Sequence, residues 1–398
     1  MLEGWKSVAL SELASFQSGG TPNKGEPSYW GGSTPWVTVK DMKVMRLNGV
    51  GESLTKAGAN TVRVVPAGTI LVLVRGMGLF KDLPVVLCNR EVAFNQDIKA
   101  LVPKEGVDSE YLATALIARK SDILRHVDSA GHGTGRLDTD LLKSTPLPLP
   151  PLPEQRKIAE ILRTWDEALE KLTDIRAAKK RWLTGITQRL TGRGGGFPDA
   201  WDLKPLNAIA TRVRRKNDGG DHPVMTISAK SGFLMQSDKF ARDMAGSSID
   251  NYTLLHAGDF AYNKGNSLAA KYGCIYQLDR PTAVVPFVYF CFTLKSGPDS
   301  NFYSHLFAAG ALNHQLSRLI NSGVRNDGLL NLNVEDFFGC RVPVPPVEDQ
   351  RRIGEALSTA KHELSLIDEE IKALTQQKRG LMQKLLTGEW RVDLKEVV

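Results

Sequence analysis

Two long segments of the sequence place apolar residues at alternating intervals of three and four, the pattern of a helix that packs against another helix. The first carries this pattern at Leu162, Trp165, Leu169, Leu172, Lys179, Leu183, Ile186 and Leu190, with Arg176 interrupting it. The second carries it at Leu357, Ala360, Leu364, Ile367, Ile371, Leu374, Lys378, Leu381 and Leu385. Each helix would run for about 37 residues, or about 55 Å. That length favours a coiled coil over the alternative, an amphipathic helix packed on a globular core.

A proline-rich segment precedes each helix and is nearly the same both times. Pro148-Leu-Pro-Pro-Leu-Pro-Glu-Gln-Arg-Lys-Ile158 returns 195 residues later as Pro343-Val-Pro-Pro-Val-Glu-Asp-Gln-Arg-Arg-Ile353. Trp5 and Leu190-Thr-Gly192 have counterparts at Trp201 and Leu386-Thr-Gly388. These repeated residues predict a tandem duplication, in which each copy consists of a globular segment followed by a helix. Because proline disfavours helix, we expect Pro146–Pro153 to be extended and the first helix to begin at Glu154.

The globular segments contain short apolar runs separated by turn residues, such as Trp36–Val39, Ile70–Val74 and Val284–Leu294, and this texture predicts β-strands. Helical character is expected near Ser109–Lys120 and Phe302–Ser317. The predicted fold class is α+β: two β-rich modules separated by two long helices that form an antiparallel coiled coil, with pseudo-twofold symmetry. The expected boundaries are 1–147 and 193–342 for the modules, 148–192 and 343–391 for the helical regions, and 392–398 for a C-terminal tail.

Composition narrows the class of partner. The chain has 398 residues and a formal net charge of +7, which weakly favours an anionic partner such as nucleic acid. The four cysteines form no CxxC pair and no metal-ligand spacing, so we interpret them as structural thiols. The N-terminus lacks a signal-peptide pattern, and no apolar run is long enough to span a bilayer. We therefore expect a cytoplasmic protein.

The sequence carries no recognisable catalytic motif. A P-loop, an HExxH motif and a GxSxG nucleophile elbow are all absent. The Pro-Pro pairs, Leu149-Pro-Pro-Leu152 and Val344-Pro-Pro-Val347, lack the polar and aromatic neighbours typical of DNA amino-methyltransferases. The expectation is a chain that is not an enzyme, without a cofactor or metal of its own.

The doubled Pro-Leu-Pro-Pro-Leu-Pro-Glu-Gln-Arg segment with its long helix resembles the specificity subunit of type I restriction-modification enzymes, over the full length of the chain. The first module adds Gly19-Gly-Thr-Pro22 and Phe94-Asn-Gln96, and the second adds Gly258-Asp-Phe-Ala-Tyr-Asn263. The resemblance implies that each module is a target recognition domain. The chain would read one half of an asymmetric, bipartite site in double-stranded DNA with each module.

The same resemblance implies partner subunits that perform the chemistry. DNA methyltransferase (modification) subunits, expected to be two, use S-adenosylmethionine. Restriction subunits, which translocate DNA, use ATP and Mg²⁺. No membrane partner is expected. Two rival functions remain open: a protein-only coiled-coil scaffold, and a catalytic methyltransferase or nuclease chain.

Candidate DNA contacts are polar or basic residues in turn-rich segments, because arginine can pair with guanine and asparagine or glutamine with adenine. For any one of them, a solvated surface role is about equally plausible. They are Thr21, Lys24, Arg75, Lys81, Asn95, Gln96, Arg136, Lys230, Tyr262, Asn263, Lys264 and Arg325.

Apolar helix residues give a second set of candidates. Trp165, Leu172, Ile367 and Leu374 lie on the seam and are expected to hold the helices together. Ile158, Ile161, Ile175 and Trp182 lie off the seam and would be costly to expose, so we predict that they help dock the modification subunits.

Overall fold

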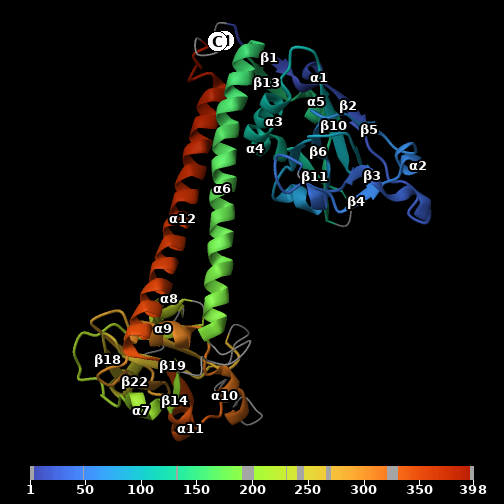
Figure 1. Ribbon diagram of the computed structural model, residues 1–398. Helices are drawn as coiled ribbons and strands as arrows, with labels where there is room; N and C mark the ends of the chain where they lie inside the picture. The colour runs from blue at the N-terminus through green and yellow to red at the C-terminus, as the bar shows by residue number, and fades with distance from the viewer. Residues whose placement is uncertain are drawn as a thin grey trace. The chain divides into compact units, whose positions relative to one another are not determined.

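The computed structural model describes residues 4–47, 49–130, 133–190, 201–229, 231–239, 246–265, 270–320 and 330–394. The chain divides into two compact units (Figure 1). Unit 1 comprises Met1–Leu172 and Glu370–Val398, and unit 2 comprises Thr173–Glu369. Each unit therefore contains a part of both long helices, α6 (Leu152–Leu190) and α12 (Val347–Thr387).

Unit 1 is rich in short strands, as the sequence predicts. In chain order, with η for a 3-10 helix, its elements before α6 are β1 (Lys6–Ala9), α1 (Leu10–Leu13), β2 (Ala14–Ser18), η1 (Pro27–Tyr29), β3 (Trp30–Val37), η2 (Val39–Asp41), β4 (Glu52–Leu54), α2 (Lys56–Ala59), β5 (Val64–Val65), β6 (Ile70–Leu73), β7 (Arg75–Gly76), η3 (Met77–Phe80), β8 (Val85–Leu87), β9 (Val92–Phe94), β10 (Ile98–Pro103), α3 (Ser109–Ala118), α4 (Lys120–Leu124), β11 (Val127–Ala130), β12 (Thr134–Leu137), α5 (Thr139–Ser144) and β13 (Pro146–Leu149).

Its strands form four sheets, in the orders β2-β10-β6-β8, β4-β3-β9-β5, β11-β12-β7 and β1-β13. All four residues of β6 are buried, which explains the unbroken apolar run at this strand. The hydrophobic core extends from the sheets to the first turns of α6, where Ile158 and Leu162 are both 1% exposed.

Unit 2 is also built mainly from short strands and short helices. Its elements between the long helices are β14 (Asp202–Pro205), α7 (Leu206–Ile209), β15 (Ala210–Arg212), β16 (Met225–Ser228), β17 (Gly232–Met235), α8 (Gln236–Lys239), η4 (Gly246–Asn251), β18 (Thr253–His256), β19 (Phe260–Asn263), β20 (Cys274–Gln277), β21 (Thr282–Val285), β22 (Phe290–Leu294), α9 (Ser300–Ala308), α10 (Asn313–Leu319), α11 (Val334–Gly339) and β23 (Arg341–Val344). Its largest sheet has the order β15-β22-β19-β20.

Three predicted boundaries are wrong, each for a local reason. The helix α6 begins at Leu152, because Pro153 lies in the first turn, where a missing N–H costs nothing. The run Val284–Leu294 is split into β21 and β22 by a turn in which Tyr289 N–H donates to the Pro286 carbonyl (3.0 Å). The helix expected over Phe302–Ser317 is broken at Gly310, whose φ of 75° is incompatible with a continuing helix.

The two long helices are antiparallel, as predicted. In unit 2, Arg176 pairs with Asp368, and Lys179 Nζ lies 2.7 Å from Glu363 Oε2, so residue numbers rise along one helix as they fall along the other. In unit 1, Lys378 pairs with Asp166. Lys179 and Lys378 occupy seam positions, and each lies beside a carboxylate of the facing helix. The seam residues Trp165, Leu172, Ile367 and Leu374 are half-buried, in keeping with their expected role.

The repeated glutamine of the proline-rich segment performs the same task in both units. Gln155 is 1% exposed; its Oε1 accepts from Asp108 N (2.8 Å), and its Nε2 donates to the carbonyls of Pro150 (2.8 Å) and Gly106 (3.1 Å). Gln350 is also 1% exposed; its Oε1 accepts from Asp299 N (2.8 Å), and its Nε2 donates to the Pro345 carbonyl (2.7 Å). Each glutamine thus ties the start of a long helix to its own unit.

The short helix beside each glutamine is fixed in the same way. Asp108 and Asp299 accept hydrogen bonds from backbone N–H groups at the starts of α3 and α9, respectively. Tyr111 and Tyr303 donate to the carbonyls of Pro148 (2.8 Å) and Pro343 (3.0 Å). The repeated segments of the sequence therefore make the same packing contacts in both units.

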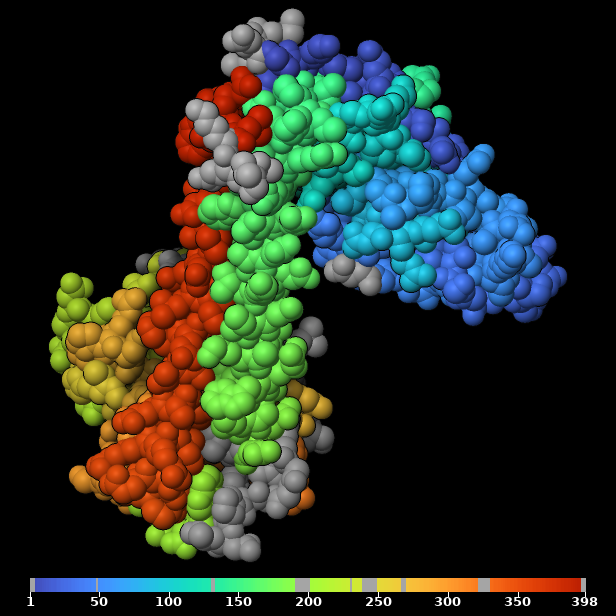
Figure 2. All heavy atoms as spheres, turned by 45° about the horizontal axis from the view of Figure 1, so that its top comes forward, coloured from blue at the N-terminus to red at the C-terminus, as the bar shows by residue number. Residues whose placement is uncertain are grey.

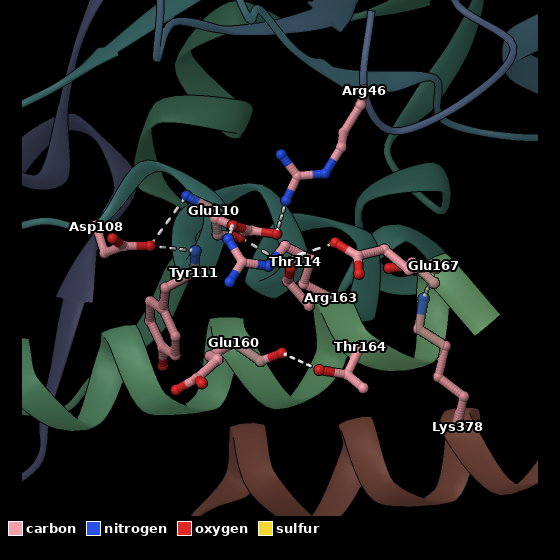
Figure 3. Close-up of polar contacts among 11 residues, drawn as sticks. Arg46, Asp108, Glu110, Tyr111, Thr114, Glu160, Arg163, Thr164, Glu167 and Lys378 are labelled. Carbon is pink, nitrogen blue, oxygen red and sulfur yellow. Dashed lines mark hydrogen bonds and ion pairs between the residues drawn. The ribbon is translucent and has the colours of Figure 1, made fainter. Parts of the chain in front are cut away.

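The polar contacts between the short and long helices differ between the units. In unit 1, Glu110 of α3 pairs with Arg46 and lies 3.9 Å from Arg163 of α6 (Figure 3). In unit 2, Ser358 of α12 donates to Asn301 (2.8 Å), and its oxygen lies 2.9 Å from His305 Nε2. On the other side of the ring, Nδ1 lies 2.9 Å from Lys361 Nζ. A neutral His305 with its proton on Nε2 satisfies both contacts.

This arrangement predicts a loss of stability in acid. Burial, with the Lys361 ammonium as a second cause, lowers the pKa of His305 to about 4. An unfolded histidine has a pKa of about 6.5, so between these values only the unfolded chain binds the proton. The free energy of unfolding should fall by at most about 3 kcal/mol as the pH drops from 6.5 to 4. Urea unfolding at several pH values should show a weaker decline for His305→Gln. An identical decline in both proteins would contradict this assignment.

Candidate nucleic-acid interface

The loop at Gly19–Lys24, which carries two of the candidate DNA contacts, packs against the turn at Asn95–Gln96, which carries two more. Thr21 Oγ1 donates to Gln96 Oε1 (2.6 Å), and Gly20 N–H donates to the Phe94 carbonyl (2.9 Å). A Cβ on residue 19 would lie 2.3 Å from the Phe94 oxygen, so the close approach requires glycine there. The side chains of Thr21 and Gln96 are both exposed.

Two tryptophans support this loop from within. Trp36 is 3% exposed, and its Nε1 donates to the Gly20 carbonyl (3.0 Å). Trp30 donates to the Asn23 carbonyl (3.2 Å) and packs edge-on against Trp36. Lys24 Nζ lies 5.7 Å from the centre of the Trp36 ring. The tryptophans shape the loop, and Lys24 is the basic group that it exposes.

Arg75 and Arg136 face each other across neighbouring strands. The antiparallel register of β7 and β12 pairs Arg136 with Arg75, and both are exposed. Asp128 of β11 lies on the other side of Arg136. Within the described residues, no ion pair is formed by either arginine. Like charges directly opposite each other are unfavourable, so a bound anion would stabilise this pair.

The backbone links the arginine pair to the loop and turn. Arg75 N–H donates to the Asp97 carbonyl (3.2 Å), and Asp97 N–H donates to Asn95 Oδ1 (3.2 Å). Asn95 is half-buried and shapes this turn. Lys81 is exposed where η3 ends. The structure therefore brings Thr21, Lys24, Arg75, Asn95, Gln96, Arg136 and Lys81 into neighbouring parts of unit 1.

The candidate DNA contacts of unit 2 include side chains that are buried or bonded within the fold. Tyr262 is fully buried, donates to the Tyr272 carbonyl (2.8 Å) and stacks on Phe337, so the prediction that it contacts DNA is wrong. Asn263 donates to the Ile227 carbonyl (3.0 Å) and accepts from Gly265 N (2.9 Å), which makes it a structural side chain. Lys264 Nζ lies 5.1 Å from the centre of the Phe290 ring. Lys230 and Arg325 lie outside the described residues.

Of the four predicted docking residues, two pack on unit 1 itself. Ile158 is 1% exposed within the core, so the predicted docking contact by its side chain is wrong, whereas Ile161 packs half-buried against that core and its docking role stays a prediction. Ile175 and Trp182 remain 47% and 52% exposed. In unit 2, Trp182 borders a groove of about 580 Å³ whose lining also includes Ala178, Ala356 and Ala360.

Two features of unit 1 have no counterpart among the predicted sites. Glu154, with a side chain 3% exposed, accepts from Trp5 Nε1 (3.1 Å) and from Arg391 Nε (2.7 Å), so the C-terminal residues lie against the start of α6 (Figure 2). Met77 and Phe80 expose large apolar side chains next to Arg75. The only sequence signal for the exposed pair is that two apolar residues stand in a glycine-rich turn.

The described residues contain no group of three or more His, Cys, Asp or Glu side chains that could hold a metal ion. Burial raises the pKa of the Cys88 and Cys291 thiols to about 12, as expected of structural thiols. No helix within the described ranges is long and apolar enough to cross a membrane.

Comparisons with known proteins agree with the predicted resemblance. A family model described as type I restriction modification DNA specificity domain matches residues 2–179. The specificity subunit of the EcoR124I/EcoR124II type I restriction enzyme of Escherichia coli is 32% identical over 173 residues, which cover 43% of this chain and 42% of that protein. This chain is similar to type I specificity subunits.

The relationship extends beyond the matched segment. The specificity subunit of the MjaIX type I restriction enzyme of Methanocaldococcus jannaschii is 23% identical over 98% of this chain and 94% of that protein. The crystal structure of a type I S subunit from M. genitalium has the same fold over 96% of both chains, with a TM-score of 0.58 and 16% identity. The chain spans under half of the E. coli relative but nearly all of these two.

Proposed function

We propose that this chain is the DNA sequence-recognition subunit of a type I restriction-modification enzyme and performs no catalysis itself. The observation that carries the proposal is the exposed site of unit 1. There the paired arginines and the Thr21–Gln96 contact lie within the segment that matches the DNA specificity family model. Each module, 1–147 and 193–342, would read one half of a bipartite site.

The contacts divide by chemistry into backbone and base recognition. Lys24 and Lys81 are point charges suited to phosphates, which contribute affinity but no sequence information. Arg75 and Arg136 carry the planar guanidinium that pairs with guanine O6 and N7. Gln96 already accepts from Thr21, so its amide N–H groups remain to donate to a base acceptor.

The partners would be the modification subunits, with S-adenosylmethionine, and restriction subunits, with ATP and Mg²⁺. The resemblance to type I specificity subunits implies two modification subunits. The groove beside Trp182 suits a partner that brings an apolar side chain together with polar groups, since the exposed ring and three alanines are bordered by charged residues. These are Lys179, Arg352, Glu355 and Glu363.

An exchange of module one tests the proposal. The β1 strand pairs with β13, which ends at Leu149, so the exchanged segment should cover residues 1–149 to keep that pair intact. The incoming domain should carry equivalents of Trp5 and Asp108, which contact the retained Glu154 and Gln155. We expect the methylated site to change in one half only, as mapped by sequencing methylated host DNA.

The outcomes separate the rival functions. A change in both halves would contradict the assignment of one half-site to each module. Failure of the parent chain to bind any duplex when assembled with its methylase would favour a protein-only scaffold. Binding of S-adenosylmethionine by the isolated chain would favour a catalytic protein.

A further inference from the structure

The 3-10 helix η3 exposes two large apolar side chains side by side. Met77 is 74% exposed and Phe80 is 52% exposed. Residues three apart in a 3-10 helix lie on the same side, so the two side chains form one apolar tip. A single exposed apolar residue needs no explanation, but an adjacent pair of this size suggests a contact surface.

The tip is held firmly from below. Leu79, between the two exposed residues, is 1% exposed and belongs to the core of unit 1. A Cβ on Gly135 of β12 would lie 3.1 Å from the Leu79 Cβ, so the glycine permits the close packing of η3 on this strand. Beyond the tip, Asp82 N–H donates to the Gly78 carbonyl (3.0 Å), and Asp82 pairs with Lys120 (2.7 Å). The exposed side chains therefore extend from a fixed support.

Three basic side chains lie around the tip, with Asp128 beyond Arg136 and Asp82 after Lys81. Arg75 precedes it in the chain, Arg136 faces Arg75 across β7 and β12, and Lys81 follows it. A surface that combines apolar side chains with guanidinium groups complements DNA, in which apolar base faces lie between two rows of phosphates. Methionine and phenylalanine are among the residues that proteins insert between base steps.

We propose that Met77 and Phe80 form an apolar wedge that packs between bases at one step of the half-site read by unit 1, while Arg75 and Arg136 hold the flanking DNA. The inference rests on the proposed function and specifies how the site engages its substrate. The cost of unstacking depends on the base step, so the wedge would add sequence preference at a position without a hydrogen bond to the protein.

The test uses the full chain assembled with its modification subunits and a duplex that contains the methylated site. 2-Aminopurine, which becomes brighter when unstacked, replaces single bases of the half-site other than the methylated adenine. We expect one position to brighten on binding of the parent complex and to stay dark with Met77→Ala/Phe80→Ala. The double variant should bind about tenfold or more weakly, with an unchanged slope of log affinity against log salt, because no phosphate contact is lost.

Two controls sharpen the comparison. Leu141→Ala removes another exposed apolar side chain of unit 1, which lies among Asp138 and Asp140, and should leave binding unchanged. Arg75→Ala should weaken binding and relax discrimination at one base of the half-site, because its guanidinium is assigned to guanine. Thermal unfolding of each complex checks that the fold is retained.

Each outcome has one meaning. If the parent complex shows no sequence preference, the proposed function fails. If the parent is specific and the double variant binds equally well, the inference is overturned. If the double variant binds weakly but still brightens the same position, the tip contacts DNA without unstacking it, and the wedge is overturned.

Discussion

Replacing Gln155 with leucine is expected to lower the free energy of unfolding by about 3 kcal/mol or more. Leucine fills most of the space but makes none of the three hydrogen bonds to Asp108, Gly106 and Pro150. Each buried backbone group left without a partner costs about 1–3 kcal/mol. Urea unfolding of the full chain measures the total loss, and hydrogen exchange at the Asp108 amide shows where it occurs.

The second repeat supplies a matched comparison. Gln350→Leu removes two hydrogen bonds, to Asp299 and Pro345, so its effect should be smaller and confined to unit 2. Gln376→Leu, on an exposed position of α12, should change stability by at most about 0.5 kcal/mol. Equal stabilities for all three variants would mean that the glutamines are not what joins the long helices to their units.

The pattern of the long helices was predictable because it is local. Alternate spacings of three and four place seam residues on one face wherever a helix forms, and the structure half-buries that face. The role of Gln155 was not predictable, although its recurrence at Gln350 marked it. Its partner Asp108 lies 47 residues away in the chain, and no local pattern identifies a contact at that distance.

Ile158 and Tyr262 show why some candidate contacts proved to be buried side chains. Ile158 is off the seam, but the first turns of α6 pack on the core of unit 1, so a second apolar face is already covered there. Tyr262 lies on β19, a central strand of its sheet. The ring of Tyr262 packs into one core and Ala261 into another, so both faces of the strand are buried. A motif on such a strand indicates packing, and the sequence alone does not show which strands are central.

Most candidates in the loops of unit 1 are exposed, because glycine and polar residues there mark turns and solvent-facing groups. The contact between Thr21 and Gln96 joins two segments that the sequence had marked separately. The pairing of Arg75 with Arg136 depends on strand register, which the sequence did not provide. The exposed tip at Met77 and Phe80 was not predicted, because apolar residues in a strand-rich module are expected to be buried.

Replacing Trp182 with glutamate is expected to abolish co-purification of the chain with its modification subunits. The indole is half-exposed at the edge of a groove that three alanines also line, so a partner that fills the groove would bury it. Truncating a buried interface tryptophan typically costs about 2 kcal/mol or more, and a buried carboxylate without a partner adds a desolvation penalty. The measurement is pull-down of the methylase by the tagged chain, followed by titration to obtain the change in affinity.

The fold should survive this change because Trp182 contributes little to the core, and thermal unfolding of the lone chain verifies this. Phe287→Glu is the matched control: Phe287 is 64% exposed in the same unit but does not line the groove, so assembly should be retained. Ile175→Glu tests how far the contact extends along α6, since Ile175 is the other exposed apolar residue predicted to dock the partner. Full assembly of both Trp182→Glu and Ile175→Glu would show that this face of α6 stays in solvent and that the modification subunits bind elsewhere.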